Sequence, residues 1–261
     1  MKTLEQIEPG VSQSFFDYLK KSEFQYDIGM QFVYKNYDTI WDFFSREVAK
    51  NGLKLKVFTT FSKYVQRFFK TSKLQKIVQY PLVFLGTAPY EAPALYNIMS
   101  HVDFNLGLFY PQGGIYQIAR ALQNIAEKYG VHIRTSAPVA YFHVDDNTKQ
   151  INRVELDDGT NIQTDIVVCN ADMAWAETNL LDTQYQTYTK KYRQKKKFAP
   201  SAFIMYLGIK GKVDNLLHHT LFFSEDWKKN FGEIFETKEL PEIPSLYLCT
   251  PSKTDPHVAP D

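Results

Sequence analysis

The histidines and cysteines are the side chains of this sequence best suited to bind a metal ion. His218 and His219 are adjacent, and Cys169 and Cys249 form no CxxC pair. The other histidines show no spacing typical of metal ligands: they are His101, His132, His143 and His257. Consecutive residues of a strand point to opposite faces, so we expect His218 and His219 not to reach one ion. The sequence therefore predicts no metal site.

Catalytic motifs of fixed spacing are absent. The sequence has no GxSxG elbow, and neither cysteine has the local features of a nucleophile. The carboxylate pairs Asp145-Asp146 and Asp157-Asp158 lie in turn-forming stretches, where we expect solvated turn residues. GxGxxG and GxxxxGK[ST] are missing as well, which excludes the phosphate-binding turn of a dinucleotide fold or a P-loop from this segment.

Gly113 and Gly114 precede an amphipathic pattern. Two interpretations stay open for them. They form a tight turn into a helix, or they let the backbone approach a ligand closely.

The composition narrows the class of protein. Of the 261 residues, 44% are hydrophobic and 23% charged, which is typical of a globular chain and excludes intrinsic disorder. The net charge of +1 gives no electrostatic case for nucleic-acid binding. The 20 Phe and 17 Tyr indicate large apolar contact surfaces or a long apolar cavity.

Cysteine usage and hydropathy indicate the compartment. Two cysteines exclude a disulfide scaffold and suit a reducing cytosol. The start of the chain has no apolar stretch typical of a signal peptide, and no apolar run is long enough to span a bilayer. We expect a cytoplasmic protein, soluble or peripheral on the membrane. Lys190 to Lys197 holds six basic residues in eight, which suits either a solvated face or an anionic membrane surface.

Helical periodicity dominates the first third of the chain. One apolar stripe comprises Phe61, Tyr64, Val65, Phe68 and Phe69, and a second comprises Tyr37, Ile40, Trp41, Phe44 and Val48. We expect Ser12 to cap a shorter helix. Pro81 disturbs a helix that begins near Leu74, and residues 94–99 start another.

The middle and the end combine helices and strands. A helix over 115–126 is followed by Gly130 as its C-terminal cap, then by short strands at 131–134, 138–144 and 154–156. The apolar run Ile166 to Cys169 is typical of a strand covered on both faces. Strands are also predicted at 203–209, 220–223 and 245–248, with a short helix over 226–235. The pattern predicts an α/β chain with an inserted β-meander.

Three ordered motifs carry a resemblance to a known family. They are Gly107–Tyr116 (GLFYPQGGIY), Ser136–Val139 (SAPV) and Val167–Asp172 (VVCNAD). Together they resemble the phytoene desaturase family of FAD-dependent carotenoid oxidoreductases. The flanks 4–10, 201–209 and 234–236 look most similar to its dehydrosqualene (4,4′-diapophytoene) desaturase branch. The resemblance covers nearly the whole chain.

The resemblance implies an incomplete fold of the amine-oxidase and glutathione-reductase type, lacking the N-terminal Rossmann unit. It implies substrate-domain helices at 1–106, a central FAD-domain segment at 107–175, and a substrate-domain antiparallel sheet with short helices at 176–261. By the same resemblance, Val139 contacts the adenine of FAD through its main chain, and Asn170 lies in the cofactor region. We expect this chain alone not to hold FAD, because the pyrophosphate site is missing.

The resemblance also implies the substrate, an apolar C30 or C40 polyene that gives hydride to the flavin. Such a molecule has no polar group that could form hydrogen bonds, so we expect an apolar binding pocket to recognise it. The candidate wall residues flank the junction between the two implied regions: they are Phe104, Phe109, Tyr110, Met205 and Tyr206. Catalytic residues and oligomeric state are not predicted.

Two other functions stay open. An amine-oxidase-like flavoenzyme acting on a polar substrate would have a cavity with acidic walls. A non-enzymatic lipid-binding or membrane-surface module would use the basic run together with exposed aromatic side chains.

Overall fold

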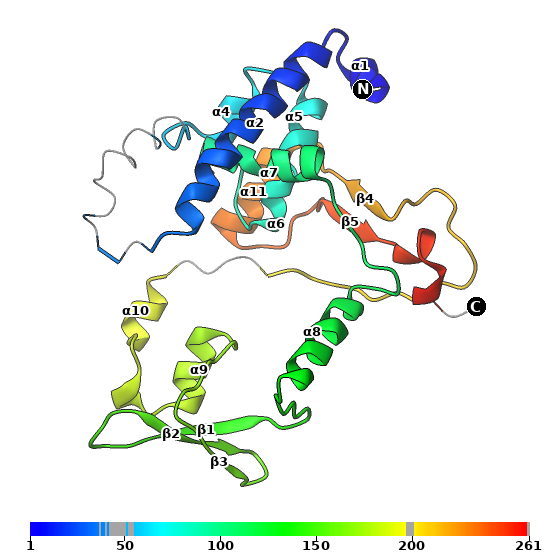
Figure 1. Cartoon of the computed structure of the whole chain (residues 1–261). Coiled ribbons are helices and arrows are strands. Elements are labelled where there is room, and N and C mark those ends of the chain that lie inside the picture. The colour runs from blue at the N-terminus through cyan, green and yellow to red at the C-terminus, as the bar shows by residue number, and fades with distance from the viewer. Residues whose placement is uncertain (37, 40, 42–50, 52–54, 197–200, 260–261) are drawn as a thin grey trace. The chain divides into compact units, whose positions relative to one another are not determined.

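The computed structural model describes residues 1–36, 38–39, 41, 51, 55–196 and 201–259 (Figure 1). The chain divides into two compact units. Unit 1 comprises residues 1–117 and 200–261, and unit 2 comprises residues 118–199. The second of the two predicted helical stripes, at 37–48, lies mostly outside the described residues.

One long helix and several short ones build the first part of unit 1. They are α1 (Lys2–Ile7), α2 (Ser12–Val33), α4 (Phe61–Val65), α5 (Ser72–Gln79), α6 (Pro81–Phe84) and α7 (Ile98–His101). A 3-10 turn, Ala94–Asn97, precedes α7, and a π-helical turn, Val102–Leu106, follows it. Helix α2 packs along α7 (Figure 1). As predicted, Pro81 interrupts helical structure, since α5 ends at Gln79 and α6 starts at the proline.

Helix α2 differs from its prediction in length and in its cap. It runs for 22 residues, because a buried stripe from Phe15 to Ile28 continues along it. Ser12 is not the cap: Val11 occupies that position. The amide of Ser12 instead donates to Glu5 Oε1 at 2.9 Å, and its hydroxyl donates to the same carboxylate. The Glu5 carboxylate therefore ties α1 to the start of α2.

Aromatic rings fill the core of unit 1. Phe69 is fully buried and meets the rings of Tyr18 at 5.1 Å and Phe15 at 6.2 Å. The hydroxyl of Tyr18 lies 2.7 Å from Ser100 Oγ, which satisfies the only polar atom of that buried side chain. Burial raises the pKa of Tyr18 above its ordinary value. The stripe predicted from Phe61 to Phe69 is buried except for Phe68, which is half-buried, although helix α4 itself ends at Val65.

The carboxylate of Glu8 binds the backbone just ahead of α5. It accepts hydrogen bonds from Lys70 N at 3.0 Å and from Thr71 N and Oγ1 at 2.8 and 2.9 Å. Burial alone would raise the pKa of Glu8, but the hydrogen bonds from Thr71 and Lys70 outweigh it and lower that pKa below 4.5. The partial positive charge at the N-terminal end of α5 also stabilises this negative carboxylate.

We expect the free energy of unfolding of unit 1 to depend less on pH in the acid range when Glu8 is replaced by glutamine (Glu8→Gln). A carboxylate with a lowered folded-state pKa stabilises the fold fully above pH 4.5, and this stabilisation is lost as the pH falls through the folded-state value. Urea unfolding at several pH values between neutral and acidic measures the effect. The variant should lose less stability on acidification than the parent chain, and equal losses would contradict the assignment.

The second part of unit 1 holds a two-stranded sheet. Strands β4 (His219–Phe222) and β5 (Leu246–Cys249) pair antiparallel, as the sequence predicted for this region. Helix α11 (Trp227–Gly232) lies between them in the chain and continues as a π-helical turn, Glu233–Thr237. Trp227 and Phe231 are buried with Ala88 in a smaller core.

Unit 2 contains the predicted meander. Strands β1 (Val139–Val144), β2 (Ile151–Leu156) and β3 (Asn161–Gln163) form an antiparallel sheet in that order. Helix α9 (Met173–Leu180) packs on β1, where Ala176 and Leu180 are buried with Phe142. Helix α8 (Tyr116–Lys128) enters this unit from unit 1, and Gly130 follows it with φ +81° as the predicted cap.

Three segments predicted as strands are irregular. Residues 131–134, 166–169 and 203–209 form no strand in the described structure. Ile166 and Val168 are 80% and 91% exposed, so the predicted strand covered on both faces is not present here. A strand needs a neighbouring strand to pair with, and these three segments pair with no strand among the described residues. The observed architecture is therefore helices with small antiparallel sheets, a mixed α/β chain.

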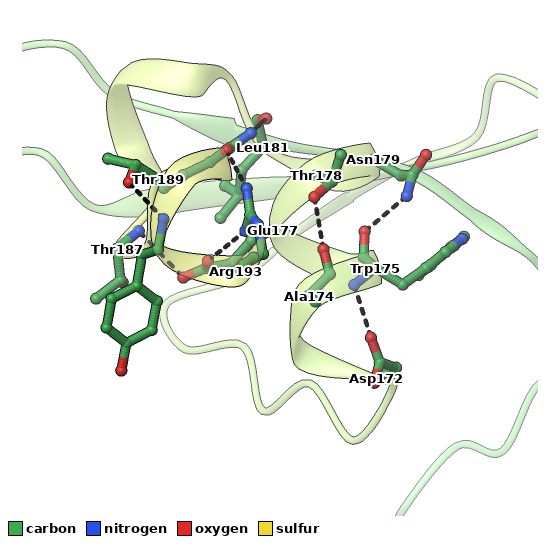
Figure 2. A network of polar contacts seen from close by, with 12 residues as sticks. Asp172, Ala174, Trp175, Glu177, Thr178, Asn179, Leu181, Thr187, Thr189 and Arg193 are labelled. Carbon is green, nitrogen blue, oxygen red and sulfur yellow. Dashed lines mark hydrogen bonds and ion pairs between the residues drawn. The ribbon is translucent and has the colours of Figure 1, made fainter. Parts of the chain in front are cut away.

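The basic segment that begins at Lys190 contains one arginine in a largely buried ion pair and several exposed lysines. In α10 (Lys190–Gln194), Arg193 Nη1 lies 3.0 Å from Glu177 Oε2, and both side chains are largely buried. Figure 2 shows this pair, with the amide of Thr187 donating to the same carboxylate. The lysines at 190, 191, 195 and 196 remain exposed. Among the described helices, none is both long and apolar enough to cross a membrane.

Candidate functional site

Val139 lies half-buried at the beginning of β1, beside an apolar cavity of unit 2. The cavity has a volume of about 390 Å³. The sheet contributes Val139, Val154, Leu156 and Ile162 to its walls, and the irregular stretch contributes Ile166, Val167 and Val168. Arg134 is the one fully charged side chain among its lining residues. Apolar walls beside one cation can accommodate a flat apolar ring that lies next to an anionic group.

Asn170 lies apart from that cavity wall. It is exposed in the turn that leads into α9, and it is not among the residues lining the cavity. The last residue of the turn, Asp172, has a structural role: its carboxylate accepts the amide of Trp175 at 2.8 Å and caps α9 (Figure 2). A cofactor contact by Asn170 stays a prediction.

A second cavity of unit 2 is polar. Its volume is about 420 Å³, and its walls include His143, Asp145, Asp146 and Arg153. Asp145 accepts the amides of Thr148 and Asn147 at 2.8 and 3.0 Å. These bonds match the turn-forming role expected for the carboxylate pairs. Asp158 likewise accepts the amide of Thr160 at 2.8 Å.

The five predicted wall residues do not form one cluster in this structure. Phe104 packs edge-on against Phe15 at 5.5 Å, inside unit 1. Phe109 is 90% exposed and Tyr206 93% exposed, and Met205 is exposed as well. Neither of the two cavities of unit 2 includes any of the five. Their role as a substrate wall stays a prediction.

Tyr110 leads into the turn at Gly113 and Gly114, which a buried carboxylate holds. Asp255 is 3% exposed, and its Oδ2 accepts the amide of Gly113 at 2.6 Å. Its Oδ1 accepts the amide of His257 at 3.1 Å, which caps the 3-10 turn Pro256–Val258. One side chain thus joins segments that lie 142 residues apart in the sequence.

The two glycines are required by this geometry. Their φ values are +81° and +95°, in the left-handed region where a side chain is strained. A Cβ on Gly113 would also lie 3.0 Å from Gln117 Nε2, which is a tight contact, whereas a Cβ on Gly114 would make only ordinary contacts. The turn interpretation is therefore confirmed, and close approach of a ligand stays untested.

Three side chains near this turn and the β4–β5 hairpin have shifted pKa values: they are Tyr110, Tyr247 and His219. Burial, followed by the charges of Asp255 and Cys249, raises the pKa of Tyr110. Burial, together with a hydrogen bond and the charge of Cys249, raises the pKa of Tyr247 to about 12. Burial, followed by the neighbouring ring of His218, lowers the pKa of His219. These shifts keep the two phenols protonated and favour a neutral imidazole at His219.

Asp255 was missed by sequence reasoning. The signal was nevertheless present, since an aspartate directly before a proline is typical of a helical N-cap followed by proline at the first position. Its second partner, the amide of Gly113, could not be found from the sequence because it belongs to a distant segment.

Comparison with known proteins identifies the family. Residues 53–259 match the family model described as flavin containing amine oxidoreductase. The chain belongs to this family. The match spans parts of both units, including the Gly113-Gly114 turn, Val139 and Asp255.

Curated relatives of the chain include proteins named as carotenoid and phytoene desaturases. The chain is 43% identical to carotenoid 3,4-desaturase of Haloarcula japonica over an alignment 261 residues long, which covers 98% of this chain and 52% of the relative. It is 32% identical to the ζ-carotene-forming phytoene desaturase of Myxococcus xanthus over 100% of this chain and 50% of the relative. It is 34% identical to phytoene desaturase of Phycomyces blakesleeanus over 98% of this chain and 44% of that enzyme. The chain spans about half the length of these relatives.

Proposed function

We propose that this chain is part of an FAD-dependent carotenoid desaturase, which removes hydrogen from an apolar polyene. The observation that carries the proposal is the end-to-end similarity of the chain to relatives named as carotenoid and phytoene desaturases. The surplus of phenylalanine and tyrosine supports it, because aromatic side chains bury a large apolar area with few rotamers.

The apolar cavity beside Val139 is the proposed adenine site. Its aliphatic walls exclude water from one face of a flat ring, and Arg134 can balance an adjacent negative charge. When bound, FAD supplies an acceptor for hydride from the substrate. The residues of this chain then have to orient the nucleotide and keep the reacting region dry. Asn170 keeps its proposed place in the cofactor region, at the turn before α9.

Substrate recognition is proposed to rest on apolar contact. Each buried CH₂ group of a polyene contributes about 0.8 kcal/mol, so a slot of matching length binds without hydrogen bonds. The exposed rings of Phe109 and Tyr206 and the side chain of Met205 offer such contacts, and Phe104 and Tyr110 extend the proposed wall. Exposed apolar side chains in this number are typical of a surface that a ligand or another segment covers.

An amine-oxidase-like reaction on a polar substrate is the alternative. Its one specific support is the polar cavity near Asp145 and Arg153. The relatives named for carotenoids favour the polyene instead.

We also propose that the enzyme works at the cytoplasmic face of a membrane, where its substrate would dissolve. The exposed lysines of 190–196 could contact anionic lipid there.

Expression of the complete coding sequence in a host that makes phytoene or dehydrosqualene tests the proposal. We expect new conjugated double bonds, seen as visible carotenoid absorption, and a purified protein with a flavin spectrum. Flavin binding with oxidation of amines and no polyene conversion would instead support the alternative. The 261-residue chain alone is expected to bind no FAD, and a yellow purified chain would contradict that.

Phe109→Asp in that complete enzyme tests the substrate wall. A carboxylate in an apolar slot is strongly disfavoured, so we expect polyene conversion to fall by about tenfold or more. The flavin spectrum should stay unchanged, because Phe109 is not among the residues lining the proposed adenine cavity. Phe16→Asp, at an exposed position of α2, is the matched control and should keep normal conversion. Equal conversion by the two variants would remove Phe109 from the wall.

A further inference from the structure

Three potential metal ligands meet at the open end of the β4–β5 hairpin in unit 1. His219 and Cys249 are direct partners across the two strands. His218 completes the group, and one ligand atom from each of the three residues lies within 4.8 Å of the others. The expectation that the side chains of His218 and His219 point to opposite faces is wrong for this geometry, since their ring centroids lie 4.4 Å apart.

The expected alternation fails because His218 lies just outside the strand. Strand β4 begins at His219, while the carbonyl of His218 accepts the amide of Thr250 at 2.7 Å. The two imidazole rings therefore lie on the same side, with centroids 4.4 Å apart. Tyr110 holds the ring of His218 from another side in an edge-on contact at 4.7 Å.

Hydrogen bonds orient both rings. Thr254 Oγ1 donates to the carbonyl of Pro251 at 3.3 Å, so it accepts from Nδ1 of His218, which lies 2.5 Å away. This assignment leaves a lone pair on Nε2 of His218. That atom is buried and has no hydrogen-bond partner in the structure. Nδ1 of His219 lies 2.7 Å from the hydroxyl of Tyr247. Metal-binding histidines are typically held in this way through the ring nitrogen that does not touch the metal.

We propose that His218, His219 and Cys249 form a binding site for a divalent transition-metal ion of the zinc type. Two imidazoles and one thiolate are ligands that zinc prefers, and three protein ligands leave a fourth position open. Tetrahedral zinc requires ligand atoms about 3.5 Å apart. The side chains of His219 and Cys249 are exposed at the hairpin end, so small rotations can close the group around an ion. The site is independent of the proposed flavin chemistry.

Cobalt(II) titration of the purified, chelator-treated chain tests this site. Cobalt replaces zinc in tetrahedral sites, and a thiolate ligand adds a charge-transfer band in the near ultraviolet. We expect this band and intense visible absorption to saturate at one cobalt per chain, and added zinc to remove both. The test needs no flavin and no polyene, so its failure would leave the proposed function untouched.

Matched variants locate the ligands. Cys249→Ser should abolish the charge-transfer band, whereas Cys169→Ser should keep it, since Cys169 is an exposed cysteine of unit 2. His219→Ala and His218→Ala should each weaken cobalt binding at least tenfold. Thr254→Val, which removes only the orienting hydroxyl, should weaken binding to a smaller extent.

The proposal is overturned if the parent chain shows no thiolate band with cobalt, or if the band survives Cys249→Ser. Circular dichroism compares the fold of each variant with the parent. Where a variant has lost structure, His218→Gln, His219→Gln or Cys249→Ala replaces the corresponding substitution. Retention of full cobalt affinity by all folded variants would also overturn the site.

Discussion

Replacing Phe69 with alanine is expected to lower the free energy of unfolding of unit 1 by about 3–5 kcal/mol. The ring is fully buried and contacts the rings of Phe15, Tyr18 and Phe68. Its removal loses apolar burial and leaves a cavity between helix α2 and the segment after α4. Tyr18 lies at that cavity and is held by its bond to Ser100, so the neighbouring side chains can fill the space only in part.

Urea unfolding followed by the tryptophan fluorescence of unit 1 measures this effect. Trp227 is buried in unit 1, and Trp175→Phe removes the tryptophan of unit 2 from the signal. Phe16→Ala is the control, because Phe16 lies on the same helix as Phe15 but is 56% exposed. Its effect should stay within about 0.5 kcal/mol. Similar losses in the two variants would show that the aromatic cluster is not the core of unit 1.

Replacing Asp255 with alanine is expected to cost about 2–4 kcal/mol and to release the Gly113-Gly114 turn. The substitution leaves the amide of Gly113 without its acceptor and removes the cap of the turn at Pro256–Val258. In the complete enzyme we expect polyene conversion to fall by about a hundredfold, because Tyr110 precedes this turn and a misplacement of about 1 Å can have that effect.

Hydrogen exchange at the amide of Gly113 reports the release directly. We expect faster exchange in Asp255→Ala, with Asp255→Asn in between, since one amide oxygen can still accept a hydrogen bond. Asp214→Ala, at an exposed position of the same unit, is the control. Unchanged protection of Gly113 in Asp255→Ala would mean that the carboxylate does not hold the turn.

Local patterns in the sequence predicted much of the secondary structure. The meander of unit 2, helix α8 with its glycine cap and the two strands β4 and β5 follow from periodicity and turn residues. Segments whose partners are remote were predicted less well. Residues 166–169 and 203–209 have the apolar composition of strands, yet they have no pairing neighbours in the described structure.

By itself the sequence determined the family resemblance and the mixed α/β class, because ordered motifs and side-chain periodicity are local properties. Contacts between distant segments were decided only by the tertiary structure. Asp255 holds Gly113 across 142 residues, and His218 turns toward Cys249 because it lies beyond the strand end. The alternation of side chains along a strand predicted that the two histidines lie on opposite faces. This alternation fails where regular pairing stops, since a terminal side chain is no longer confined to one face.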